Sequence, residues 1–340
     1  MKLIKTQEAV GHILCHDLTQ IIPGEFKGAR FRKGHVVTEE DVPVLLSMGK
    51  EHLYVWEMQP GMLHEDDAAL RLCGLSMGKN IRRSEDIREG KIELFAQCDG
   101  YFTVDAERLF AVNSVPDVML ATRKGCTAVK SGDKLAGMRV IPLAVPESTL
   151  EQAETAAGPE PILNVLPYRL KSAGIVTTGS EVKSGLIEDK FTPAVKRKLA
   201  AFGIETAAQI FSGDGVENVA AAIAEVRAKG VGLVLCTGGM SVDPDDNTPG
   251  GIRAAGAEIV SYGAPVLPGA MFLLGYFSDG TPVMGLPGCV MFAGATVFDL
   301  VLPAVAAGVP VSRRDIVALG NGGLCLGCKP CTYPLCPFGK

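Results

Sequence analysis

Glycine-containing turns with small polar residues recur in the second half of the sequence, each directly after an apolar, strand-like run. Glycine lets the backbone adopt positive φ and approach a ligand closely. A helix that begins at Gly288 would present free amides and a positive dipole end, which suits a phosphate. Three such turns therefore favour one binding site for an anionic ligand. The turns are Thr177-Thr178-Gly179-Ser180-Glu181, Thr237-Gly238-Gly239-Met240-Ser241 and Gly285-Leu286-Pro287-Gly288.

Carboxylates follow the second turn at an unusual density. Asp243, Asp245 and Asp246 occupy three of four consecutive positions. Beside a bound phosphate they would repel it, unless a divalent cation lies between them, and Mg²⁺ favours a few carboxylates together with substrate oxygens. The alternative is that Asp246 or Asn247 only caps a helix that begins near Thr248. Both roles can coexist on different residues.

Four of the ten cysteines crowd into the last part of the sequence at the spacing C-x₂-C-x₂-C-x₄-C. Four thiolates at such short spacing can bind one tetrahedral Zn²⁺ or an iron–sulfur cluster of the 4Fe–4S type. A segment without metal is the third alternative. These candidate ligands are Cys325, Cys328, Cys331 and Cys336.

Strands that alternate with helices must position the three turns. Such alternation predicts βαβ units and an α/β domain over residues 166–312, with a three-layer, mostly parallel sheet between helices. In such a sheet, ligands bind beyond the carboxyl ends of the strands. The expected strands are 173–177, 204–211, 231–236, 258–262 and 282–285, and the expected helices are 193–202, 215–229, 248–255 and 288–305.

The remaining sequence divides into three parts. Residues 146–165 are acidic, poor in large apolar residues and bounded by prolines, which indicates a linker. Residues 313–340 form a short cysteine-rich C-terminal tail. Residues 1–145 predict a mixed, β-rich N-terminal region without a catalytic constellation. Its expected elements are strands at 2–4, 52–55, 102–104, 110–112 and 140–143 and a helix at 41–49.

Charge and hydropathy narrow the class of partner. The net charge of −5 and the pI near 5.7 provide no basic field for nucleic acid or an anionic membrane. The first residues lack the continuous apolar core of a signal peptide. The apolar run Val290–Val311 contains Asp299 and Pro303, so we interpret it as a buried helix rather than a membrane span. The expected compartment is the cytoplasm.

The sequence around the turns resembles the molybdopterin-binding domain of the MogA/MoeA/gephyrin family. The resemblance covers about residues 170–305 and rests on TTGSEVKSGLIEDKFTPAVKRKLAAFGIE, TGGMSVDPDDNTPGGI and GLPGCVMFAGATVFDLVLP. It implies molybdopterin or adenylyl-molybdopterin as ligand or substrate. In active members, molybdate is inserted with Mg²⁺ and AMP is released, or the pterin phosphate is adenylylated. The resemblance implies a catalytic and metal-binding role for Asp246, with Asp243 as a second catalytic candidate. The expected pterin-binding residues are Thr178, Gly179, Ser180, Glu181, Gly238, Gly239, Met240, Ser241, Thr248, Pro287 and Gly288.

Departures from the family pattern leave three functions open. Ser180 stands where MoeA-type proteins have Asp, Phe191 where Asn is usual, Cys289-Val290 where Asn-Pro is usual, and Asp243-Pro244 where Gly-Asp is usual. One function is a molybdenum insertase or related transferase. The second is a non-catalytic cofactor carrier, chaperone or sensor, whose tail would dock a molybdoenzyme or report redox state. The third is a nucleotide hydrolase of the competence-damage protein type, which shares the α/β domain. The oligomeric state, including a homo-oligomer, is open as well.

Overall fold

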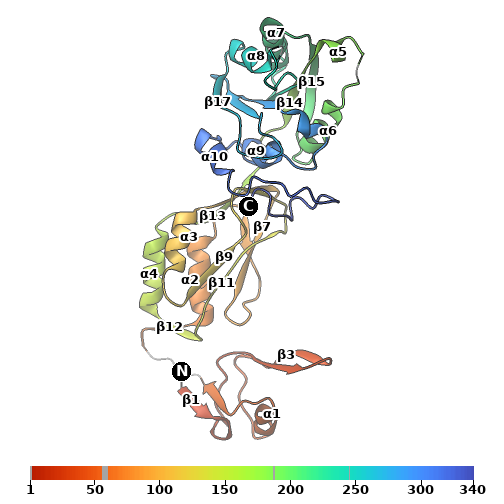
Figure 1. The fold of residues 1–340 in the computed structure, drawn as a ribbon. Helices are drawn as coiled ribbons and strands as arrows, with labels where there is room; N and C mark the ends of the chain where they lie inside the picture. Colours follow the sequence, from red (N-terminus) through yellow and green to blue (C-terminus); the bar gives the residue numbers. More distant parts are fainter. Residues whose placement is uncertain (1, 56–59, 187, 245) are drawn as a thin grey trace. The chain divides into compact units, whose positions relative to one another are not determined.

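The chain divides into two compact units in the computed structural model, which describes residues 2–55, 60–186, 188–244 and 246–340 (Figure 1). The first unit comprises residues 1–98, 103–125 and 130–165. The second unit comprises residues 99–102, 126–129 and 166–340.

Residues 2–55 fold into short elements around a small core. Leu14, Leu45 and Leu53 belong to one buried hydrophobic cluster. The strands predicted at residues 2–4 and 52–55 and the helix predicted at 41–49 are confirmed. The elements are β1 (Lys2–Lys5), which pairs with β4 (His52–Val55), β2 (Leu18–Ile22), which pairs with β3 (Phe26–Phe31), a 3₁₀ turn η1 (Thr6–Glu8) and α1 (Asp41–Ser47).

Helices lie beside a four-stranded antiparallel sheet in the rest of the first unit (Figure 1). The sheet order is β6-β7-β11-β9, and the short strands β5 and β12 pair separately. These elements are β5 (Met62–His64), α2 (Glu65–Ser76), β6 (Ile81–Arg83), β7 (Ile92–Ala96), α3 (Ala106–Asn113), β9 (Val118–Thr122), β11 (Lys134–Val140), β12 (Ala144–Pro146) and α4 (Glu147–Ala157).

A three-stranded sheet in the order β10-β8-β13 contains β8 (Gly100–Val104), β10 (Thr127–Val129) and β13 (Leu163–Pro167).

Two predicted strands of this region differ from the structure. Residues 110–112 lie inside α3, because Asp105 caps that helix by accepting a hydrogen bond from the Arg108 amide at 3.0 Å. The cap outweighs the strand preference of a short apolar run. The strand predicted at 140–143 is also wrong, since β11 ends at Val140.

The predicted linker contains a folded helix, α4, which packs in the first unit. Leu150, Ala153 and Ala157 are fully buried along one face of α4. On its exposed side, Glu154 pairs with Arg71 of α2 at 2.7 Å. Because two of the three buried residues are alanines, the apolar stripe is narrow, and the composition alone resembles that of a linker.

A six-stranded sheet forms the centre of the second unit. Its order is β15-β14-β16-β19-β18-β17, and β15, β14, β16 and β19 are mutually parallel, whereas β18 is antiparallel to both of its neighbours. The strands are β14 (Ser172–Thr178), β15 (Glu205–Ser212), β16 (Val234–Thr237), β17 (Glu258–Tyr262), β18 (Leu273–Tyr276) and β19 (Pro282–Leu286). The helices are α5 (Ser180–Lys183), α6 (Phe191–Ala200), α7 (Val216–Arg227), α8 (Thr248–Ala254), α9 (Val297–Ala306) and α10 (Arg313–Ala318), and η2 (Gly288–Met291) is a 3₁₀ turn.

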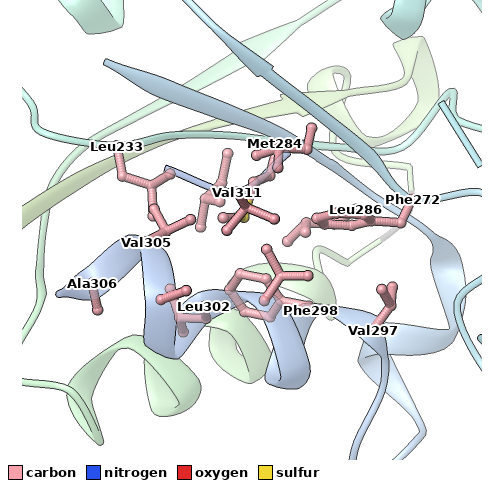
Figure 2. Packing of buried hydrophobic residues seen from close by; sticks show 14 of the residues in the cluster. Leu233, Phe272, Met284, Leu286, Val297, Phe298, Leu302, Val305, Ala306 and Val311 are labelled. Atoms are coloured by element: carbon pink, nitrogen blue, oxygen red, sulfur yellow. The ribbon is translucent and has the colours of Figure 1, made fainter. Parts of the chain in front are cut away.

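Hydrophobic clusters cover both faces of this sheet. On one face, β14, β16, β18 and β19 pack against α6 and α9, with Phe272 and Phe298 among the largest buried side chains (Figure 2). On the other face, the alternate residues of the strands pack against α7 and α8. The mixed α/β class is confirmed. Figure 1 shows α6 and α9 on one side of β14 and α7 and α8 on the other.

The long helix predicted at 288–305 is interrupted. A four-residue 3₁₀ turn, η2, is followed by a break, and α9 begins only at Val297. The break occurs because Thr296 and Asp299 form a capping box that starts α9. Within the described residues, no helix is long and apolar enough to cross a membrane.

A core substitution in α4 tests whether this segment is folded. Leu150→Ala should lower the free energy of unfolding of the first unit by about 2–5 kcal/mol, because it removes a fully buried side chain. Urea denaturation followed by far-UV circular dichroism measures the loss. Gln152→Ala, at an exposed position of the same helix, is the control. Equal stability of both variants and the wild type would show that α4 contributes nothing to the core.

Candidate functional site

The carboxyl ends of four parallel strands meet at one edge of the sheet. In the register, Thr177 of β14 is opposite Thr237 of β16, and Thr237 is opposite Leu286 of β19. On the other side of β14, Thr178 is opposite Ser212 of β15. The three glycine-containing turns predicted to share an edge therefore do so.

The order of the strands places a topological switch point between β14 and β16. The chain passes from β14 through α6 to β15 and then crosses back to β16 on the other side of β14. The connection after β14 therefore leads to α6 on one face of the sheet, and the connection after β16 leads to α8 on the opposite face. Ligands of open α/β sheets bind at such a switch point.

The first and second turns pack directly against each other through buried hydroxyls. Thr178 Oγ1 donates to the Thr237 carbonyl at 3.1 Å and lies 3.2 Å from Thr248 Oγ1. Thr248 Oγ1 donates to the Gly238 carbonyl at 2.9 Å. Thr178 and Thr248, both predicted to bind the pterin, thus fix the shape of the two turns from within the protein.

Glycine is required at the centre of the second turn for two reasons. Gly238 and Gly239 have φ values of +86° and +54°. A Cβ atom on Gly238 would lie 2.6 Å from the Thr178 carbonyl oxygen, and one on Gly239 would lie 2.8 Å from Thr248 Oγ1. The bare backbone of this turn therefore approaches its neighbour as closely as sterics allow.

A carboxylate and a phenol hold the remainder of the second turn. Asp246 Oδ2 accepts a hydrogen bond from the Ser241 amide at 2.9 Å, and the Asp246 amide donates to the Asp243 carbonyl at 2.9 Å. The Tyr262 hydroxyl donates to the Met240 carbonyl at 3.0 Å. Burial, and then the negative charge of Asp246, raise the pKa of Tyr262.

The alternative capping role is not seen for either candidate. The Asp246 carboxylate points back to the turn, and the N-cap of α8, Asn247, makes no side-chain cap hydrogen bond. Met240 is buried, and its sulfur and methyl group would lie 2.5 Å from a Cβ on Gly285, so its side chain belongs to the core between the second turn and β19. Only the backbone of Met240 can contribute to a ligand site.

Asp214, which the sequence analysis did not identify, joins the first turn from the end of β15. Its Oδ2 accepts hydrogen bonds from the amide of Ser180 at 3.1 Å and from the hydroxyl of Ser180 at 2.6 Å. The side chain of Glu181 lies outside the described residues. The signal for Asp214 was present in the sequence, since Gly213-Asp214-Gly215 also follows a strand-like run.

The third turn differs from its expected form. Gly288 begins a four-residue 3₁₀ turn instead of a long helix, so the predicted helix N-terminus that would attract a phosphate is wrong. A Cβ atom on Gly288 would meet nothing within 4 Å, which leaves the backbone of this turn open to a ligand. Pro287 precedes it as the N-cap.

Thr237, at the end of β16, carries an orphaned polar atom. Its side chain is fully buried, and its Oγ1 has no hydrogen-bond partner among the described residues. A buried hydroxyl without a partner costs free energy, and such atoms often mark a place that a ligand or water completes. Thr237 belongs to the second predicted turn but was not among the predicted binding residues.

The four clustered cysteines do not come together as a metal site. Among the described residues, no group of three or more His, Cys, Asp or Glu side chains is arranged to hold a metal ion. Cys325 and Cys336 are half-buried, whereas Cys328 and Cys331 are exposed. Hydrogen bonds with Thr332 lower the pKa of Cys328. The predicted zinc or iron–sulfur site in the tail therefore does not fit this arrangement.

Family comparisons agree with the resemblance seen in the sequence. Residues 174–307 match a family model described as "Probable molybdopterin binding domain". Residues 3–57 match a model described as "Domain of unknown function (DUF8806)". The first match confirms the resemblance of the second unit to the molybdopterin-binding domain.

Individual proteins resemble parts of the chain. CinA-like proteins of Mycobacterium sp. (strain MCS) and Desulfosudis oleivorans are 34% and 37% identical over 89 residues, which is 26% of this chain and 21% of theirs. The chain thus spans about a fifth of the length of these curated relatives. The solved structure of the molybdopterin biosynthesis enzyme MoaB from Thermus thermophilus covers 42% of this chain and 99% of its own, with 21% identity and a TM-score of 0.35. CinA from Thermoplasma acidophilum covers 35% and 89%, with 17% identity and a TM-score of 0.30.

A pair of glycine substitutions tests the contact between the first two turns. Gly238→Ala should lose about 1–2 kcal/mol for its positive φ and about 1–3 kcal/mol more for the clash with Thr178. The control is Gly230→Ala, where φ is +72° but a Cβ would meet nothing within 4 Å, so it should lose only the first term. Chemical denaturation measures both losses, and equal values would contradict the close approach.

Proposed function

We propose that the second unit, whose residues 174–307 match the molybdopterin-binding domain family, binds a phosphorylated pterin at the switch point between β14 and β16. The ligand would be molybdopterin or adenylyl-molybdopterin, and the role would be in molybdenum cofactor biosynthesis. The observation that carries the proposal is the convergence of three glycine-containing turns at the switch point of the sheet.

Backbone groups would bind the phosphate. The positive φ values of Gly238 and Gly239 turn consecutive amides at the strand end, and successive amides in such conformations form anion-binding concavities. The unpartnered Thr237 hydroxyl lies at the same strand end. Because Thr178 and Thr248 are engaged with each other, the turn is preformed, which lowers the ordering cost of binding.

Asp246 would hold Mg²⁺ together with oxygens of the ligand. One carboxylate oxygen of Asp246 binds the Ser241 amide, which orients the side chain and leaves the second oxygen as the candidate metal ligand. One or two carboxylates plus phosphate oxygens match the usual Mg²⁺ site. When bound, the cation would neutralise phosphate charge. Asp243 would be the second catalytic residue beside Asp246. The hydroxyl of Ser180, in the first turn, is held by the carboxylate of Asp214.

The reaction would be insertion of molybdate into adenylyl-molybdopterin with release of AMP. A second role, a carrier, chaperone or sensor that binds the cofactor without AMP release, is supported by the replaced polar residues. Asp189, for example, accepts hydrogen bonds from the amides of Phe191 and Thr192 at 2.9 and 3.0 Å, and Phe191 offers no polar side chain where Asn is usual. The similarity to CinA-like proteins over 89 residues favours the third role, a protein of the competence-damage type.

Two measurements on the purified full chain separate these roles. Binding of molybdopterin and of adenylyl-molybdopterin is followed by pterin fluorescence in the presence and absence of Mg²⁺. Release of AMP is then measured with adenylyl-molybdopterin, molybdate and Mg²⁺. Tight binding with AMP release indicates the insertase, and tight binding without release indicates the carrier. No pterin binding together with hydrolysis in a nucleotide panel would reject the proposal in favour of the third role.

Asp246→Asn should abolish the contribution of Mg²⁺ to binding and reduce any AMP release by about 100-fold. The loss follows because a metal contributes several kcal/mol to charge stabilisation, and each 1.4 kcal/mol is a factor of ten. Glu258→Gln is the matched control. Glu258 is an exposed carboxylate at the start of β17, at the end of the sheet where the parallel strands begin, away from the three turns. Equal Mg²⁺ dependence of both variants and the wild type would refute the role of Asp246.

A further inference from the structure

The cysteine-rich segment holds its thiols in two different environments. Cys325 and Cys336 pack against the hydrophobic cluster of the second unit, whereas Cys328 and Cys331 are exposed. A structural zinc or iron–sulfur site needs the thiolates at one point. The observed division into a half-buried pair and an exposed pair instead suits chemistry that uses two thiols.

The exposed cysteines form a local hydrogen-bonded pair. The side chains of Cys328 and Cys331 interact with each other, and Cys328 Sγ lies 3.6 Å from Thr332 Oγ1. The spacing C-x-x-C brings two thiols close enough for a disulfide within one turn of chain. A neighbouring hydroxyl donor stabilises the thiolate form of the attacking sulfur.

The rest of the segment fixes this pair on the second unit. Phe338 is buried in the core, and the Tyr333 hydroxyl donates to the Asp299 carbonyl at 3.2 Å. Cys331 rests on the loop between η2 and α9, where a Cβ atom on Gly294 would lie 2.6 Å from Cys331 Sγ. The segment that carries the two exposed cysteines is therefore packed against the second unit.

The local charge favours an anionic reaction partner. Lys329 lies between the two cysteines, and residues 320–340 contain no Asp or Glu. A positive charge beside a thiol favours the thiolate, and it attracts negatively charged small molecules. Small disulfides that carry carboxylates, of which glutathione disulfide is an example, have the matching charge.

We propose that Cys328 and Cys331 form a thiol–disulfide exchange site for a small anionic disulfide. The Cys328 thiolate attacks one sulfur of the substrate disulfide, its S–S bond breaks, and the first thiolate leaves and takes up the proton that Cys328 lost. Cys331 then loses its proton and attacks Cys328 Sγ, which releases the second thiol. The substrate gains two electrons and two protons, and the protein dithiol becomes a disulfide. This site is independent of the proposed pterin function.

The test uses the full chain, reduced and desalted under anaerobic conditions, with glutathione disulfide as the probe. Acid quenching, alkylation and peptide mass spectrometry should find one Cys328–Cys331 disulfide and two equivalents of glutathione released per chain. Cys325 and Cys336 should remain free thiols during the reaction and should be recovered as alkylated cysteines. Cys331→Ser should accumulate glutathione on Cys328 and release one equivalent, and Cys328→Ser should form no internal disulfide. Cys126→Ser, at another exposed cysteine, should behave as the wild type.

Three results would overturn the proposal. The first is unchanged release of both equivalents in Cys328→Ser. The second is a disulfide that includes Cys325 or Cys336. The third is a stoichiometric zinc ion or iron–sulfur cluster in the isolated protein whose retention requires all four cysteines, as shown by metal analysis of the four single Ser variants. Circular dichroism of each variant, compared with the wild type, verifies that the fold is retained.

Discussion

The parallel hydrogen-bond register of β14, β16 and β19 is the constraint on which the candidate site depends. It ends the three strands at the same edge, and neighbouring strands are about 4.8 Å apart. Three consecutive turns therefore span about 10 Å, which is the scale of a small phosphorylated ligand. Because the chain crosses from β15 to β16 on the other side of β14, the loops after β14 and β16 lead to opposite faces of the sheet.

Side chains in this candidate site mainly shape the backbone, and the proposed ligand would contact the backbone. The hydroxyls of Thr178 and Thr248 are engaged between the turns, Met240 packs into the core, and Asp214 holds Ser180. A site built in this way tolerates replacement of side chains that point to the ligand, because amide donors do not depend on residue type. Departures from the family pattern at positions such as Ser180 are therefore compatible with binding, while they alter the groups available for catalysis.

The cysteine-rich segment shows how packing can divide a sequence motif. Its spacing alone is equally compatible with one four-thiolate site or with smaller sets. Burial of Phe338 and the contact of Tyr333 with α9 pull Cys325 and Cys336 toward the core, and they leave Cys328 and Cys331 at the surface. The chemistry expected of the segment changes accordingly from metal binding to exchange between two thiols.

The sequence by itself determined the strands that precede the turns, the glycines at their ends and the shared edge, because apolar periodicity and glycine conformation are local properties. It did not reveal α4, whose narrow stripe of Leu150 and two alanines is recognisable only against its neighbours. The partnership of Asp214 with Ser180, the antiparallel insertion of β18 and the division of the cysteines were likewise decided by the tertiary structure. Each depends on contacts between residues far apart in the chain, and no local pattern encodes which of the possible partners will meet.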